Sequence, residues 1–174
     1  KNAVNTKDGG AIYNNGANLY LDSLNLYENT AASGGAIYNT NKGYVVITNS
    51  KLHNNNNTVK SGWNKGGSAI YNTASSKVTV DNCEIYSNYA LADGTIQSYN
   101  SVVYARTSNV NITNSIIRFN KVTYYPSAIQ NYGSEIIVDN TTIANNTGTK
   151  AAIINQDLSS AGASLTIINS RIYN

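Results

Sequence analysis

Apolar and polar residues alternate with a period of two in short stretches along the chain, which is the spacing of β-strands with one inward face. Residues 78–88 (VTVDNCEIYSN) are typical, because two alternating Val positions and an Asn are followed by one Ile and a closing Asn. The pattern predicts equivalent strands in residues 19–29, 45–55, 78–88, 110–120, 136–146 and 165–174. No segment carries a convincing helical period.

A second sequence motif, GGAIYN at residues 9–14, is interleaved with these alternating stretches. It recurs at residues 34–39 and 67–72, and weaker echoes follow at residues 94–96, 127–131 and 151–155. The two phrases cycle about every 25 to 33 residues, a period typical of repeat proteins whose units bury their apolar faces against one another. The chain is therefore predicted to be a stacked solenoid.

Each cycle holds three short strands, and the connections between them are too short to place a helix between parallel strands. We predict an all-β fold, a right-handed single-stranded parallel β-helix with three parallel sheets and about six coils. Residues 1–174 are predicted to form one solenoid domain. Because both ends fall inside a repeat, we expect this segment to be a fragment of a longer array.

Aligned columns predict which side chains face inward. One apolar column would stack inside the coil: Ile12, Ile37, Ile70, Ile96, Ile129 and Ile153. Two residues upstream, a column of small residues predicts a tight inner corner: Gly10, Gly35, Ser68, Gly94, Ser127 and Ala151. Two columns would form amide ladders: Asn49, Asn82, Asn114, Asn140 and Asn169 in one, and Asn29, Asn55, Asn88, Asn120 and Asn146 in the other.

Composition narrows the functional classes. Only 12% of the residues are charged and the net charge is +3, with the cations scattered, so the basic stripe typical of nucleic-acid binding is missing. No apolar run reaches the 18 residues or so of a membrane span. A single Cys excludes an internal disulfide and a multi-Cys metal site. We predict no cofactor and no metal.

The GGAI phrase, paired with a large apolar residue, two spacers and Asn, resembles the repeat of chlamydial polymorphic outer membrane proteins. It looks at least as much like the large adhesin-like proteins of methanogenic archaea, and both groups belong to the pectin-lyase-like β-helices. The resemblance covers essentially the whole chain. The chain departs from the chlamydial pattern in using Leu or Ile where that family prefers Phe, at Leu26, Leu52, Ile85, Ile117 and Ile143.

This resemblance implies a non-catalytic segment of an extracellular, cell-surface adhesin that acts as a stalk and presentation surface. Its expected partners are glycans or proteins on the surface of another cell. The alternative is a fragment of a polysaccharide lyase or glycoside hydrolase, because such enzymes share the pectin-lyase-like fold. The resemblance is specific for the fold but not for the function, since the matching residues are interior and ladder positions.

The carboxylates bear on that alternative, because a glycosidase needs two of them converging about 5 to 9.5 Å apart. Asp22, Asp81 and Asp139 share one outward column, where they alternate with Thr48 and Thr113. Rung spacing separates these acids by about 9.6 Å, without a focused pocket. We therefore interpret the column as a solvated row that avoids adjacent like charges, and we predict no catalytic residue.

Three further polar positions are predicted to be structural. Glu84 lies one rung from Lys51, which predicts a weak surface ion pair. The only His, His53, falls in an outward column and would stack there with Tyr27, Tyr86 and Arg118. Cys83 occupies a slot for a small packed residue that is filled elsewhere by Ser50, Ser115, Thr141 and Ser170.

Ligand binding is predicted at exposed aromatic residues, because their faces carry sugar rings well. Tyr13, Tyr38 and Tyr71 form an outward column that Gln97 and Gln130 would continue. Cross-strand packing of these rings is the competing interpretation.

Three turns are longer than their counterparts, at residues 56–65, 99–108 and 156–163, and insertions in solenoids often carry recognition. The first contains Trp63, and the second contains Tyr99 and Tyr104. Decoration of the coil without a ligand is the other interpretation of these turns. Four positions begin N-glycosylation sequons, namely Asn56, Asn111, Asn140 and Asn145.

Overall fold

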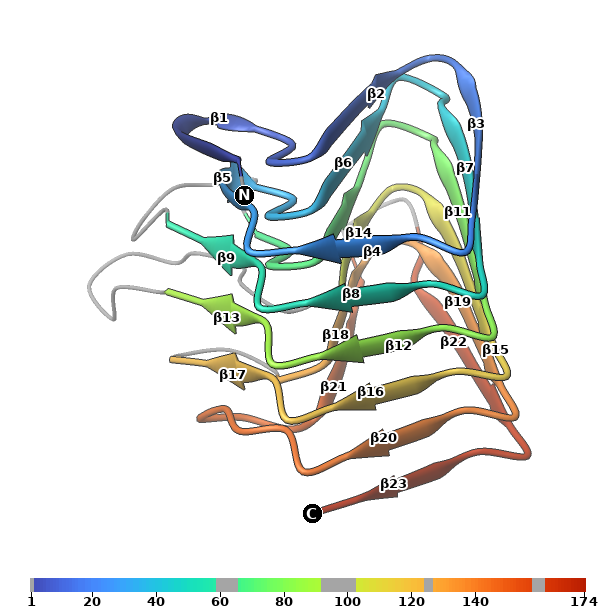
Figure 1. The fold of residues 1–174 in the computed structure, drawn as a ribbon. Coiled ribbons are helices and arrows are strands. Elements are labelled where there is room, and N and C mark those ends of the chain that lie inside the picture. Colours follow the sequence, from blue (N-terminus) through green and yellow to red (C-terminus); the bar gives the residue numbers. More distant parts are fainter. Residues whose placement is uncertain (1, 59–65, 92–102, 124–126, 158–161) are drawn as a thin grey trace.

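The computed structural model describes residues 2–58, 66–91, 103–123, 127–157 and 162–174. Within these ranges all regular structure is β-strand, and the strands stack as a parallel solenoid (Figure 1). The described part of the chain therefore contains no helix long and apolar enough to cross a membrane. The predicted all-β parallel β-helix is confirmed.

The strands form four parallel sheets, which we name A to D in chain order. Sheet A contains β1 (Ala3–Asp8), β5 (Thr30–Ser33), β9 (Asn56–Asn57), β13 (Tyr89–Ala90) and β17 (Lys121–Val122). Sheet B contains β2 (Ile12–Asn15), β6 (Ile37–Thr40), β10 (Ile70–Asn72), β14 (Val103–Arg106), β18 (Ile129–Tyr132) and β21 (Ile153–Gln156).

Sheets C and D carry the strands of the alternating pattern. Sheet C contains β3 (Asn18–Asp22), β7 (Tyr44–Thr48), β11 (Lys77–Asp81), β15 (Asn109–Thr113), β19 (Glu135–Asp139) and β22 (Ser164–Ile168). Sheet D contains β4 (Asn25–Tyr27), β8 (Lys51–His53), β12 (Glu84–Tyr86), β16 (Ile116–Arg118), β20 (Thr142–Ala144) and β23 (Arg171–Tyr173).

The prediction of three sheets is therefore wrong by one. Sheet A is the sheet that was not predicted. Three of its strands, β9, β13 and β17, have only two residues each. They follow the closing ladder Asn of each rung, where the sequence analysis expected only a connection. Two residues cannot display an alternating pattern, so the sequence carried no periodic signal for this sheet.

The chain passes through sheets B, C, D and A in turn, and six strands in each of sheets B, C and D make about five complete turns. In Figure 1 the strands of sheet D cross the near side toward the left while the chain descends from its N-terminus. This is a right-handed coil, as the handedness of parallel crossovers predicts.

The interior is filled by the inward residue of each strand, in register along the axis. In sheet C, Val78 lies next to Val45 and Val110, and Val80 lies next to Ile47 and Ile112. All are essentially inaccessible to solvent. Each such burial contributes roughly 1.5–3 kcal/mol, so this column packing stabilises the coil more than any surface contact does.

The predicted Ile column needs one correction, at the fourth turn. Ile70 pairs with Val103 rather than with Ile96, which lies outside the described residues, as does Gly94. Val103 fills the interior position and is completely buried. The long turn predicted at residues 99–108 accordingly contains strand β14.

The tight inner corner is confirmed where the structure describes it. A Cβ atom on Gly35 would overlap the backbone oxygen of Ser68, and it would lie 2.8 Å from that of Asn56. A Cβ on Gly10 would overlap the oxygen of Gly35 in the same way. The Gly residues are required here because adjacent coils approach backbone to backbone.

Both predicted Asn ladders are present, and the amides of the buried one also donate to backbone oxygens where the chain bends. In the buried ladder, the Asn88 amide donates to Asn120 Oδ1 at 3.0 Å and to the Leu52 oxygen at 3.0 Å. In the exposed ladder, Asn82 donates to Asn49 Oδ1 at 2.7 Å. The exposed ladder residues all have φ near +50°, a conformation that Asn tolerates better than most residues, namely Asn49, Asn82, Asn114, Asn140 and Asn169.

A third ladder, which the sequence analysis did not identify, lies at the end of sheet B. The Asn14 amide donates to Asn39 Oδ1 at 2.8 Å, and Asn39 donates to Asn72 Oδ1 at 2.9 Å. Ala105 then interrupts the column, and the Asn72 amide donates to the backbone oxygens of Ser76 and Asn109. These amides close the corner between sheets B and C from inside, which holds the start of each sheet C strand in place.

Candidate functional site

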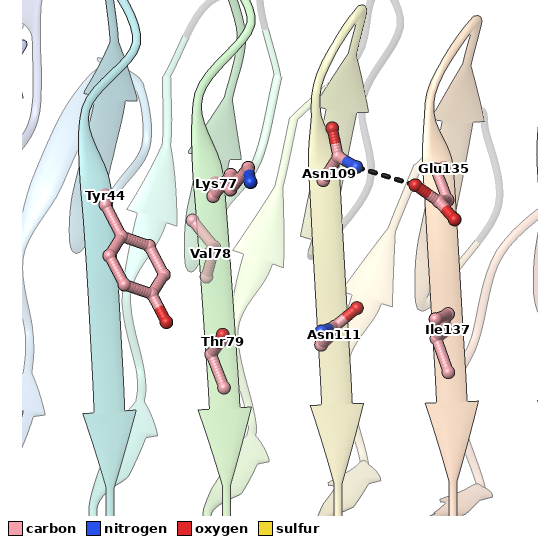
Figure 2. Close-up of a pocket in the computed structure, with 8 residues that line it drawn as sticks. All are labelled: Tyr44, Lys77, Val78, Thr79, Asn109, Asn111, Glu135 and Ile137. Atoms are coloured by element: carbon pink, nitrogen blue, oxygen red, sulfur yellow. Dashed lines mark hydrogen bonds between the residues drawn. The ribbon is translucent and has the colours of Figure 1, made fainter.

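A hollow of about 620 Å³ lies across the outer face of sheet C. We name it the sheet C groove. Its lining comes from four neighbouring strands, β7, β11, β15 and β19, and consists of Tyr44, Lys77, Val78, Thr79, Asn109, Asn111, Glu135 and Ile137 (Figure 2).

The groove follows from the size of the outward residues. Thr79 and Asn111 are neighbours in register and form part of the floor. Tyr44 stands on one side of them, one rung away from Lys77, and Ile137 stands on the other (Figure 2). The distance from β7 to β19 is three rung spacings, or about 14 Å. The floor is polar and both side walls carry apolar surface.

Two side chains in the groove hold each other in place. The Asn109 amide donates to Glu135 Oε2 at 2.7 Å, as the dashed line in Figure 2 marks. Glu135 is exposed and is the one carboxylate among the described lining residues. A carboxylate with one occupied oxygen keeps further acceptor positions for the hydroxyl groups of a ligand.

Lys77 supplies the one cation among the described groove residues. It is exposed, and none of the ion pairs found in the described part of the chain includes it. The nearest acid on its own strand, Asp81, lies four residues further along, about 13 Å away. This exceeds the screening length of about 8 Å at physiological salt, so Asp81 leaves the Lys77 charge unneutralised.

A second hollow of about 600 Å³ adjoins the groove at the corner between sheets B and C and shares Asn109 and Glu135 with it. Its other lining residues are small, namely Ser75, Thr107, Ser108, Gly133, Ser134, Gly162, Ala163 and Ser164. Turn residues with φ > 0 make this corner, among them Ser75, Thr107 and Gly133. The two hollows together extend the polar floor around the edge of the sheet.

The predicted Asp row is confirmed by the register, which alternates Asp22, Thr48, Asp81, Thr113 and Asp139 along the outer edge of sheet C. The Thr residues do more than separate charges. Thr48 donates to Asp22 Oδ1 and Thr113 donates to Asp81 Oδ1, each at 2.6 Å. These hydrogen bonds, followed by those from the ladder amides, lower the pKa of both carboxyl groups below its ordinary value.

The predicted outward column on sheet D is confirmed as a stack. The His53 ring lies between those of Tyr27 and Tyr86, at centroid distances of 5.3 and 4.7 Å. Burial, followed by the nearby charge of Lys51, lowers the pKa of His53. Arg118 lies over the Tyr86 ring at 5.9 Å.

The predicted pair between Lys51 and Glu84 is present at 3.8 Å, but Arg118 binds the same carboxylate more closely, at 2.8 Å. Cys83 is buried as a small packed residue, and its thiol donates to the Asp81 backbone oxygen at 3.1 Å. Burial also raises the pKa of this thiol. The Glu84 carboxylate and the Cys83 thiol are therefore both engaged in contacts within the coil.

The predicted aromatic column on sheet B is a stack of parallel rings. Tyr38 lies between Tyr13 and Tyr71, at centroid distances of 5.2 and 4.9 Å. The column continues through Tyr104 to Gln130, whereas Gln97, which was expected in it, lies outside the described residues.

Solvent exposure changes sharply along this stack. Tyr13 is 56% exposed, but Tyr71 and Tyr104 are buried, so the expected open ligand face ends after Tyr38. Burial raises the pKa of Tyr38 to about 12. Tyr104 was predicted in a loop and lies in β14 instead. The other loop candidates, Trp63 and Tyr99, lie outside the described residues.

The sequence analysis missed the sheet C groove, although its column was visible. The residues immediately before each alternating stretch are Asn18, Tyr44, Lys77, Asn109, Glu135 and Ser164, and they are in register. The alternating stretches themselves start one residue later, at the first apolar position. When each stretch is extended by one residue toward the N-terminus, an aromatic ring, a cation, an amide and a carboxylate fall into one row, namely Tyr44, Lys77, Asn109 and Glu135.

Comparison with known proteins adds no assignment to this geometry. No family model, curated protein or solved structure matches the chain.

Proposed function

We propose that this chain is a segment of an extracellular, adhesin-like surface protein, in which the solenoid is a stalk and the sheet C groove is a glycan-binding surface. The observation that carries the proposal is the groove itself, where amides, a hydroxyl and a carboxylate line a floor beside an aromatic side chain. This combination matches the apolar faces and hydroxyl edges of sugars.

The stalk role is supported by the way the coil is held. Hydrogen-bonded amides link one rung to the next inside the structure, as from Asn55 to Asn88 and from Asn88 to Asn120. Flat stacks of Tyr rings repeat the same spacing outside. A solenoid bound in this way at each rung acts as a stiff spacer that presents its outer faces laterally.

Glycan-array binding tests the proposal with three single variants beside the wild type. We expect Tyr44→Ala to weaken binding roughly twofold to tenfold, the usual contribution of one aromatic contact. Tyr13→Ala serves as the matched control, because Tyr13 is exposed on a different sheet. Trp63→Ala tests the long turn at residues 56–65, which the sequence analysis named as a candidate for recognition.

The outcomes separate the possible surfaces. Loss of binding in Tyr13→Ala or Trp63→Ala, with Tyr44→Ala unaffected, would move the glycan site to the positions that the sequence predicted. Absence of binding to any glycan would remove the binding role and leave the stalk. Release of oligosaccharides from pectin or a related polymer, with or without calcium, would instead support the lyase or hydrolase alternative.

A further inference from the structure

The charges of the sheet C groove are arranged to distinguish among sugars. Lys77 and Glu135 belong to the same outward column and are separated by Asn109, which places their strands two rungs or about 9.6 Å apart. Asn109 is hydrogen-bonded to Glu135, while Lys77 has no carboxylate partner among the described residues. The groove therefore presents one uncompensated positive charge beside one partly engaged negative charge.

On this basis we propose that the groove binds a short oligosaccharide with a single acidic sugar, whose carboxylate pairs with the Lys77 ammonium group. The inference rests on the proposed glycan-binding function. The acidic ring would lie between Tyr44 and Asn109, which are the neighbours of Lys77 in its column. A neutral sugar would follow over Asn111, with its hydroxyl groups within reach of Glu135.

The same arrangement disfavours a polyanion. A second carboxylate two rungs from the first would face Glu135, and like charges at close range oppose binding. The preferred ligand therefore carries one negative charge within the length of the groove, rather than one on every sugar.

Three probes test this inference by calorimetric titration at low ionic strength: sialyllactose, its neutral parent lactose, and a trimer of uronic acid. We expect sialyllactose to bind the wild type roughly fivefold more tightly than lactose, the effect of one exposed ion pair. The uronic acid trimer should bind more weakly than sialyllactose. Added salt should reduce the preference for sialyllactose.

Lys77→Gln should make the affinities for sialyllactose and lactose equal. Lys42→Gln is the matched control, because it removes the same charge from an exposed turn residue outside the groove lining and should keep the preference. Equal wild-type affinities for the two sugars, or a preference that survives Lys77→Gln, would overturn the inference while leaving glycan binding intact. Tighter binding of the uronic acid trimer would also overturn it. Failure of all three probes to bind would count against this inference and against the glycan role together.

Discussion

Replacing Asn88 by Ala offers a direct measure of what one rung of the buried ladder contributes. Asn88 is 1% exposed. Its amide donates to Leu52 O and Asn120 Oδ1, and its Oδ1 accepts from the backbone N–H and the side-chain amide of Asn55, all at 2.9–3.0 Å. The substitution therefore removes four hydrogen bonds at once.

The magnitude depends on which partners are left unsatisfied. The Asn55 amide keeps its second bond to Leu26 O, and Asn120 Oδ1 still accepts the backbone N–H of residue 88. The Asn55 backbone N–H loses its bond to the ladder, at a cost of roughly 1–3 kcal/mol, and the remaining lost bonds cost about 1 kcal/mol each. We expect Asn88→Ala to destabilise the fold by roughly 4–6 kcal/mol.

Urea unfolding followed by far-ultraviolet circular dichroism measures this effect. With a slope of about 2 kcal/mol per molar urea, the midpoint should fall by roughly 2–3 M at an unchanged slope. Asn111→Ala is the control, because Asn111 is exposed on the outer face of sheet C, and it should change stability by no more than about 0.5 kcal/mol. Equal effects of the two substitutions would refute the claim that the ladder stabilises the coil.

Two other predictions concern single columns. Gly35→Ala should destabilise the fold by roughly 1–3 kcal/mol because its Cβ would overlap the backbone oxygen of Ser68. Ser68→Ala should be neutral or stabilising in the same urea assay, since it removes a buried hydroxyl without a partner in the described structure. A larger loss of stability in Ser68→Ala than in Gly35→Ala would contradict the tight packing of this corner. Asp81, whose pKa is lowered chiefly by Thr113, adds stability above its unfolded pKa and loses that contribution as pH falls through the folded pKa. Thr113→Val should raise the pKa of Asp81 in an NMR titration, and an unchanged value would assign the shift to another group.

The sequence predicted the sheets with alternating strands because their period is strong and repeats in each rung. It failed at the fourth turn, where the chain between β13 and β14 is as long as that between β9 and β10 and longer than the connections from β1 to β2, from β5 to β6 and from β17 to β18. The spacing from Val103 to Val110 equals that from Ile12 to Leu19, which favours the observed register. That spacing alone is not decisive, because Ile153 and Leu165 are twelve residues apart and an insertion can occur at any corner.

The candidate site was harder to predict than the fold. Period two separates inward from outward side chains, but it does not tell whether an outward position is exposed. Tyr13 and Tyr71 share one outward column, yet the first is 56% exposed and the second 1%. The groove depends on the relative sizes of neighbours on different rungs, such as Thr79 beside Asn111, and these are defined only when the register is known.

The direction of the ladder bonds has a mechanical consequence. Hydrogen bonds between rungs, in the sheets and in the ladders alike, point along the axis of the coil, and the two ends of the described chain lie at opposite ends of that axis (Figure 1). Tension applied between the termini would pull on these bonds end-on and unwind the coil from its extremities, one turn after another. Under a pulling force the molecule should lengthen in successive steps, each set by the number of residues in one turn, and so absorb work gradually instead of breaking at a single threshold.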